Sequence, residues 1–281
     1  MTEVPPLESY MDVIQPSSEL SVSDGVCAYI NAGGRGTRLN AVFTPDEKTG
    51  ITKALLRFDK GGETLIQRHI DALLTSGFDD IIVGVGDHHH VKQYIETTYD
   101  DAYVHAIDYD DQLGNGGDML RAVQDYSELF TDSIYVANVD TFINIDKRAV
   151  AERHRQNGAD MTFVLTMSEG VPNYQAFYVD ENDRILHTNE DARAILSDET
   201  RENTHYRGSS TGSMMLAKTA LQAYEWKPSD GAIGLYREVV GDIIAKGRAY
   251  AYNNGHRPFI DIGTEDTWRR VNDPQFTLEQ Q

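Results

Sequence analysis

The stretch that decides the fold is residues 26–39, which read VCAYINAGGRGTRL. Its first six residues are mostly apolar and β-forming, as is typical of a buried strand. Gly33, Gly34 and Gly36 follow directly, so the strand is expected to end in a tight loop. Sheets of parallel strands bind ligands at such strand ends. We therefore expect a ligand-binding loop after a central strand.

Strand-like and helix-like segments alternate after this loop. Apolar spacing predicts a helix over 64–76, a strand over 81–85, a short helix over 90–97, a strand over 103–107, a helix over 119–130 and a strand over 133–139. The alternation is typical of a mostly parallel sheet with helices on both faces. The expected fold class is α/β, a Rossmann-like three-layer sandwich with a mixed sheet.

The second half of the chain is less regular. Strands are predicted at 161–167, 175–179, 184–187, 213–216 and 249–252, a helix at 235–245, a closing apolar stretch at 259–263 and irregular structure at 191–204. Residues 1–24 contain three prolines and five acidic residues but no basic residue, which predicts a loosely packed arm. One domain is expected over residues 25–273, followed by a tail at 274–281.

Composition narrows the class of protein and its partners. The chain has 281 residues, with 45 acidic against 25 basic ones and a formal charge of −20. Such a charge repels nucleic acids and anionic membranes, so neither is expected as a partner. No apolar run approaches the roughly 18 residues of a membrane span. The single cysteine, Cys27, excludes an internal disulfide, favours a reducing compartment and predicts a cytoplasmic protein.

The glycine loop matches neither common nucleotide fingerprint, because the P-loop spacing and the G-x-G-x-x-G spacing are both absent. Its glycines still leave backbone N–H groups unshielded. Arg35 and Arg38 add positive charge that can fork onto phosphate oxygens. An ordinary glycine-rich turn with surface arginines is the structural alternative for the loop taken alone.

The loop and four later segments resemble the sugar-1-phosphate nucleotidyltransferases, also called nucleoside-diphosphate-sugar pyrophosphorylases. The signature of that family is a strand, then A-G-G-x-G-T-R-L, then P-K-x-L. This chain has the corresponding segments, in the family's order, at 32–39, at 52–56 (TKALL), at 113–117 (LGNGG, like L-G-T-G-G), at 138–140 (NVD, where the family has G-D) and at 261–264 (DIGT). The resemblance covers residues 26–271.

The resemblance implies a GT-A-like fold and a reaction in which a nucleoside triphosphate and a sugar 1-phosphate form a nucleotide sugar and pyrophosphate. It implies catalytic roles for Arg35 on the pyrophosphate and Lys53 on the α-phosphate, with Mg²⁺ held by Asp140 and Asp261. Nucleotide-binding residues, in a half spanning about 25–145, are implied at Ala32, Gly33, Gly34, Gly36, Thr37, Arg38, Gln112, Gly116 and Gly117. Sugar-phosphate-binding residues are implied at Asn138, Thr211 and Gly212, and Arg193 is expected in the same role. The sugar-phosphate-binding half is expected to span about 146–273. Homo-oligomer formation stays open.

The sequence departs from the family pattern in three places. Thr52 stands in place of the proline, and Val139 in place of the glycine before Asp140. The region 188–193 has no lysine where many relatives have E-K-P. We expect an arginine from this irregular region, namely Arg193, Arg201 or Arg207, to bind the sugar phosphate instead.

Several of these candidate residues also have an alternative explanation that involves no ligand. Taken alone, Asp140 is read as a cap, Asp261 as a turn residue and Lys53 as a solvated lysine. The histidines at 88–90 are expected to form a solvated helix entrance rather than a metal site, and Cys27 a buried structural thiol. A metal-dependent glycosyltransferase of related fold and a non-catalytic nucleotide-sugar-binding protein are the alternative functions.

Overall fold

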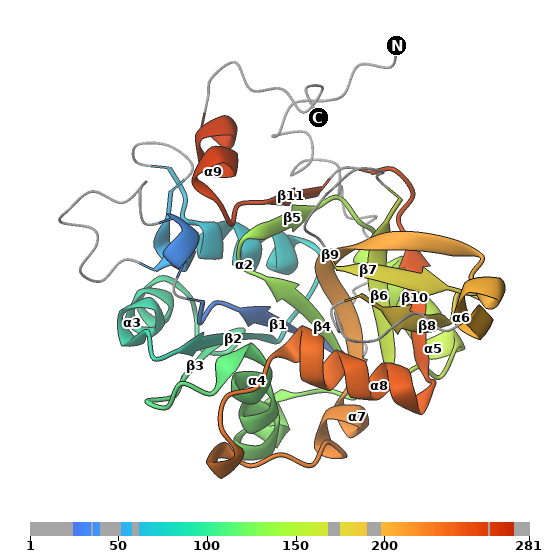
Figure 1. Ribbon diagram of the computed structural model, residues 1–281. Coiled ribbons are helices and arrows are strands. Elements are labelled where there is room, and N and C mark those ends of the chain that lie inside the picture. The colour runs from blue at the N-terminus through green and yellow to red at the C-terminus, as the bar shows by residue number, and fades with distance from the viewer. Residues whose placement is uncertain are drawn as a thin grey trace.

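The computed structural model of the chain describes residues 25–34, 36–39, 52–57, 62–167, 175–189, 198–257 and 259–272 (Figure 1). The expected arm and tail lie outside the described residues, as do Arg35 and Arg193. Among the described residues, no helix combines the length and the apolar character needed to span a membrane.

One mixed sheet forms the centre of the described structure (Figure 1). Its strands are β1 (Val26–Asn31), β2 (Ile81–Gly86), β3 (Val104–Asp108), β4 (Ser133–Asn138), β6 (Met161–Thr166), β7 (Ala176–Val179), β8 (Ile185–Thr188), β9 (Tyr206–Ala217) and β10 (Ala249–Asn253). The order is β10-β6-β9-β4-β1-β2-β3, with β7 paired to β9 and β8 paired to β7. β1 is parallel to β2 and β4, whereas β9 is antiparallel to β4 and β6.

Helices cover both faces of this sheet (Figure 1). The α-helices of the described structure are α2 (Leu65–Thr75), α3 (His89–Thr98), α4 (Gly114–Asp125), α5 (Lys147–Gln156), α6 (Asp198–Asn203), α7 (Lys218–Gln222), α8 (Val240–Lys246) and α9 (Glu265–Val271). Alternate residues of β1 show the two layers. Val26, Ala28 and Ile30 join one core with α2, α3 and α5, while Cys27 and Tyr29 join a second core with α4, α7 and α8. The expected fold class is confirmed.

Several boundaries differ from the sequence prediction. α4 begins at Gly114 rather than near residue 119, so the 113–117 segment forms a helix start. Lys53 begins a single 3₁₀ turn, Lys53–Leu55, that buries Ala54. The segment 191–204, expected to be irregular, contains α6.

β9 is three times as long as predicted, because its polar half also pairs with neighbours. Gly208 and Ser209 pair with β7, and Ser209 and Ser210 pair with β6. Backbone hydrogen bonds of this kind do not require an apolar sequence pattern. The polar run at 208–213 is therefore strand despite lacking the alternation that marks one.

A separate two-stranded sheet joins distant parts of the chain. β5 (Thr141–Ile143) follows β4 directly and pairs antiparallel with β11 (Phe259–Asp261), so that Thr141 lies opposite Asp261 (Figure 1). The Ile262 N–H donates to the Asp140 carbonyl over 2.7 Å. This pairing places the end of β11 beside the end of β4.

Candidate active site

A cleft of about 560 Å³ opens at the carboxyl ends of β1, β2 and β4. Its walls come from the glycine loop, the Lys53 turn, the start of α3, the start of α4 and the end of β11. Of the residues predicted for the site, it is lined by Gly33, Gly34, Arg38, Lys53, Gln112, Asn138, Asp140 and Asp261. These residues were predicted from five separate segments, and the fold brings them together.

Two carboxylates occupy one end of this cleft. Asp140 lies two residues after the end of β4, and Asp261 ends β11, so the β5–β11 pairing brings them together across 120 intervening positions. Burial, and then repulsion from Asp140, raise the pKa of Asp261 to about 6, while Lys53 and Arg38 act in the opposite direction. Such a raised pKa shows that a second negative charge is poorly tolerated here.

The donor set at this end suits a hard divalent cation. Asp261 Oδ1 is buried and has no hydrogen-bond partner among the described residues. The described residues contain no cluster of three or more His, Cys, Asp or Glu side chains that could hold a metal ion. Mg²⁺ needs no such cluster, because it commonly takes one or two carboxylates together with water and substrate phosphate oxygens. The pair therefore fits Mg²⁺.

Lys53 supplies a positive charge to the same end. Its Nζ forms an ion pair with Asp140 Oδ2, and both side chains are largely buried. Two glycines of the loop leave room for it. A Cβ on Gly36, whose φ is +59°, would lie 3.1 Å from Lys53 Cβ, and one on Gly34 would lie 3.7 Å from its Nζ. The glycine loop thus packs directly over the lysine.

The other predicted residues of the glycine loop lie in different environments. Ala32 is fully buried, and its N–H donates to the Gly84 carbonyl over 2.8 Å. Thr37 begins a short 3₁₀ turn, Thr37–Leu39, whose Arg38 lines the cleft. A Cβ on Gly263 would lie 3.0 Å from Arg38 Nη2 and 2.6 Å from Asp261 Oδ1. The Arg38 guanidinium therefore lies near the second carboxylate.

Gly116 and Gly117 have a packing role in this structure and do not line the cleft. Both N–H groups donate to the Ile233 carbonyl, over 3.1 and 3.4 Å. A Cβ on Gly117 would lie 3.0 Å from the Trp226 ring, and one on Gly116 would lie 2.8 Å from the Gly234 backbone. These hydrogen bonds and close contacts thus hold the segment that precedes α8 against the start of α4, beside the cleft.

Gly114→Ala is expected to lower the free energy of unfolding by at least about 1 kcal/mol. Gly114 has φ +74°, a region that costs other residues roughly 1–2 kcal/mol, and its added Cβ would lie 2.5 Å from the Ile233 carbonyl oxygen. Urea unfolding measures the loss. Gly241→Ala in α8 is the matched control, because nothing lies within 4 Å of that Cβ and a gain of up to about 1 kcal/mol is expected. Equal stability of the two variants would contradict this close packing of residue 114 against Ile233.

Asp118 is a cleft residue that the sequence analysis missed. It lies on α4, is 9% exposed, and its Oδ1 has no hydrogen-bond partner among the described residues. Burial, followed by the neighbouring charge of Asp87, raises the pKa of Asp118 to about 7. Its position directly after Gly116 and Gly117 was the available signal. Other lining residues missed in this way include Asn31, Asp87 and Tyr236.

The residues predicted for the sugar phosphate are only partly brought together. Asn138 lines the cleft and accepts a 3.4 Å hydrogen bond from Asn31 Nδ2. Gly212 packs against Asn138, and its carbonyl accepts a hydrogen bond from Tyr236 Oη. Thr211, however, is buried, and its hydroxyl donates to the Val164 carbonyl. Arg207 lies over the Tyr178 ring and does not line the cleft, while the side chain of Arg201 lies outside the described residues.

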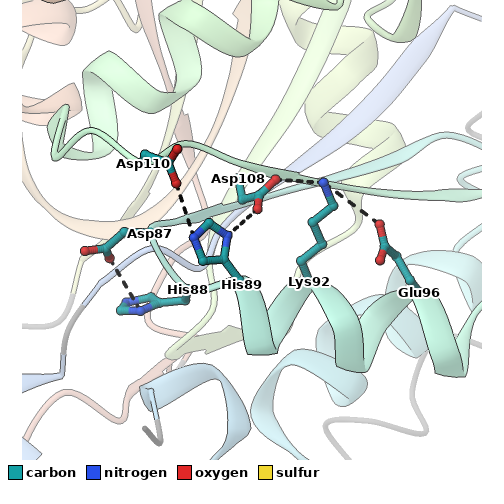
Figure 2. A network of polar contacts seen from close by, with 7 residues as sticks. All are labelled: Asp87, His88, His89, Lys92, Glu96, Asp108 and Asp110. Carbon is teal, nitrogen blue, oxygen red and sulfur yellow. Dashed lines mark hydrogen bonds and ion pairs between the residues drawn. The ribbon is translucent and has the colours of Figure 1, made fainter.

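His88 and His89 have different partners, as Figure 2 shows, and the His90 ring lies 5.8 Å from the His88 ring. His88 is the N-cap of α3 and lies 3.5 Å from Asp87, whereas His89 contacts Asp108 at 2.5 Å and Asp110 at 3.3 Å. Lys92 also contacts Asp108, at 2.7 Å (Figure 2). The helix entrance is solvent-exposed at His89, as expected, and its contacts with Asp108 and Asp110 join α3 to the segment that leads into the cleft wall.

The His89 contact is expected to weaken as the pH rises. The hydrogen bond to Asp108 raises the pKa of His89 above 6.5, so the stabilisation is complete below 6.5 and is lost as the pH rises through the folded-state value. NMR titration should show His89 titrating above 6.5, and closer to 6.5 in Asp108→Asn. Glu96→Gln, which alters the 4.0 Å contact with Lys92, is the control. A wild-type His89 that titrates at or below 6.5 would contradict the contact.

Comparison with known proteins adds to this geometry. The sequence matches the MobA-like NTP transferase domain over residues 28–203, more than half of the chain. The chain belongs to this family. The transferase is 22% identical over 245 residues to a D-glycero-alpha-D-manno-heptose 1-phosphate guanylyltransferase of Aneurinibacillus thermoaerophilus, covering 87% of this chain and 96% of that protein.

A second relative is matched over a shorter stretch of this chain. The transferase is 27% identical over 175 residues to a UTP–glucose-1-phosphate uridylyltransferase of Synechocystis, covering 57% of this chain and 42% of that protein. The chain thus matches less than half the length of this relative. Both relatives carry nucleotidyltransferase names, and the chain is an enzyme of that class. The resemblance seen in the sequence motifs is confirmed.

Two solved structures share the fold. HddC from Yersinia pseudotuberculosis, complexed with GMP-PN, superposes with a TM-score of 0.65 at 19% identity, covering 87% of this chain and 97% of that one. The inositol-1-phosphate CTP transferase from T. maritima superposes with a TM-score of 0.65 at 15% identity, covering 89% of this chain and 97% of that one. At these identities the likeness establishes the architecture of the transferase.

Proposed function

We propose that this transferase joins a nucleoside triphosphate to a sugar 1-phosphate and releases pyrophosphate. The observation that carries the proposal is the grouping of Lys53, Asp140 and Asp261 at one end of the cleft, next to the glycine loop. Phosphoryl transfer requires compensation of negative charge more than it requires a covalent nucleophile. The names of both relatives, which specify a heptose 1-phosphate and glucose 1-phosphate, support the acceptor class.

In the proposed reaction, an oxygen of the sugar phosphate forms a bond to the α-phosphorus. The bond from that phosphorus to the bridging oxygen breaks, and pyrophosphate leaves with its electron pair. The attacking oxygen already carries negative charge, so no side chain has to remove a proton. The protein must instead hold two anions in line and reduce their repulsion.

Lys53 is proposed to hold the α-phosphate. Its Nζ is paired with Asp140, so it is already fixed at the end of β4, and it can turn to a phosphate oxygen when substrate enters. Arg38, and Arg35 outside the described residues, are proposed to bind the β- and γ-phosphates. Asp140 and Asp261 are the residues that would hold Mg²⁺, which when bound supplies positive charge to the phosphate oxygens. Arg193 stays a prediction for the sugar phosphate.

Pyrophosphate release tests the proposal. Purified protein is incubated with Mg²⁺, each of the common nucleoside triphosphates and a panel of hexose and heptose 1-phosphates. One pair should give pyrophosphate and nucleotide sugar in equal amounts. Transfer of sugar from a nucleotide sugar to an acceptor would instead indicate the glycosyltransferase alternative. Tight binding of a nucleotide sugar without turnover would indicate the non-catalytic alternative.

A further inference from the structure

The cleft has two chemically different ends, separated by two successive glycines. A Cβ on Gly34 would lie 3.7 Å from Lys53 Nζ, whereas one on Gly33 would lie 3.2 Å from Asp118 Oδ2 and 3.0 Å from the Gly86 N–H nitrogen. Lys53 lies with the paired carboxylates Asp140 and Asp261. A triphosphate bound at the Lys53 end, over the glycine loop, would extend its base toward the Asp118 end.

Asp118 has the features of a ligand-binding group. It is nine-tenths buried, lines the cleft, and its Oδ1 has no hydrogen-bond partner among the described residues. The groups that face it from neighbouring elements are Asp87, at the start of α3, and the tyrosines Tyr29 of β1 and Tyr109 after β3. Burying a carboxyl without a partner is unfavourable, so a ligand that donates hydrogen bonds is favoured here.

We propose that Asp118 recognises the nucleobase, and that the base is guanine. This inference rests on the proposed function, because it concerns the triphosphate of the same reaction. A carboxylate accepts hydrogen bonds through both oxygens. Guanine presents two adjacent donors, N1–H and the 2-amino group, and so forms a charge-assisted pair with it. The names of the relatives and structural neighbours specify guanylyl, uridylyl and CTP transfer, and therefore do not decide the base.

The other bases fit an ionised carboxylate less well. Uracil and thymine have one N3–H between two carbonyl oxygens, which would face the negative charge. Cytosine and adenine each pair one amino donor with a ring-nitrogen acceptor. Those two bases match a protonated carboxyl, which both donates and accepts. Because the Asp118 pKa is raised, the two protonation states are distinguished by the pH dependence of binding.

Binding of GTP and of ITP, which lacks the 2-amino group, tests the inference. Titration calorimetry of the full chain with Mg²⁺ at pH 8 should show GTP binding tighter than ITP by on the order of 10-fold to 100-fold, the value of one hydrogen bond to a charged group. CTP and UTP should bind more weakly than GTP. In Asp118→Asn the GTP-to-ITP ratio should approach one, because the amide turns a donor toward the base. Asp125→Asn, an exposed site on the same helix, is the control that should keep the ratio.

Several outcomes would overturn the inference. They are equal binding of GTP and ITP by the wild type, tighter binding of UTP or CTP, affinity for GTP that rises toward pH 5.5, and an unchanged ratio in Asp118→Asn. The wild-type comparison stands even if that variant does not fold. Because binding is measured without turnover, a chain that prefers GTP but releases no pyrophosphate would refute the proposed function and leave this inference standing.

Discussion

Asp140→Asn and Asp261→Asn are each expected to lower kcat by on the order of 10²–10³ while leaving the fold intact. Each change keeps the side chain's size but removes a negative charge from the proposed Mg²⁺ site. Steady-state pyrophosphate release measures the loss. Asp266→Asn, an exposed position of α9 close to Asp261 in sequence, is the control that should keep full turnover.

The double variant and the metal requirement make this prediction specific. If both carboxylates hold one ion, removing the second after the first should cost little more, so the two losses should not multiply. Activity should disappear in EDTA and return with Mg²⁺. Losses that multiply in the double variant would contradict a shared ion, and full activity in EDTA would contradict any role for a metal.

Asp261→Asn is expected to raise the stability of the protein at pH 8 although it lowers the activity. Its folded-state pKa of about 6 lies above the ordinary value of 3.8, so the ionised carboxyl destabilises the fold as the pH rises through that interval. Asp261→Asn removes the charge. Its Tm without metal should therefore exceed that of the wild type at pH 8 and approach it near pH 4. A lower Tm at pH 8 would mean that the variant is inactive because it is misfolded.

Lys53→Met is expected to lower kcat by a similar factor, on the order of 10²–10³. Methionine fills the space of the lysine stem but supplies no charge to the α-phosphate. Lys246→Met, which removes an exposed lysine paired with Asp242 on α8, is the matched control and should be close to wild type. Lys53→Arg should recover part of the rate, since it restores the charge with a different geometry. An unchanged kcat with a raised KM would assign Lys53 to binding alone.

Local elements were predictable where local interactions determine them. α2 starts where Thr64 Oγ1 accepts a hydrogen bond from the Gln67 N–H, and it ends just before Gly77, whose φ is +82°. Both signals lie within the helix's own sequence. β1 and its glycine loop were predicted for the same reason, because an apolar run and the φ preference of glycine are properties of the residues themselves.

Contacts with residues far away in sequence explain where the structure differs from the sequence prediction. Gly116 and Gly117 read as a nucleotide-binding loop, yet their N–H groups are occupied by Ile233, more than 100 residues later. β9 was recognised only over 213–216, since the backbone partners of its polar half lie on β6 and β7. A local pattern does not record which carbonyl will approach a given N–H group.

By itself, the sequence determined the layered α/β architecture, the strand that carries the glycine loop and, through its motifs, the nucleotidyltransferase family. The tertiary structure alone decided which of the charged residues meet. The β5–β11 register places Asp261 opposite Thr141 and so beside Asp140, and the approach of α4 to Gly33 and Gly86 buries Asp118 in the cleft. Strand register and helix packing are summed over many weak contacts between distant segments, whereas periodicity and motif spacing describe one segment at a time.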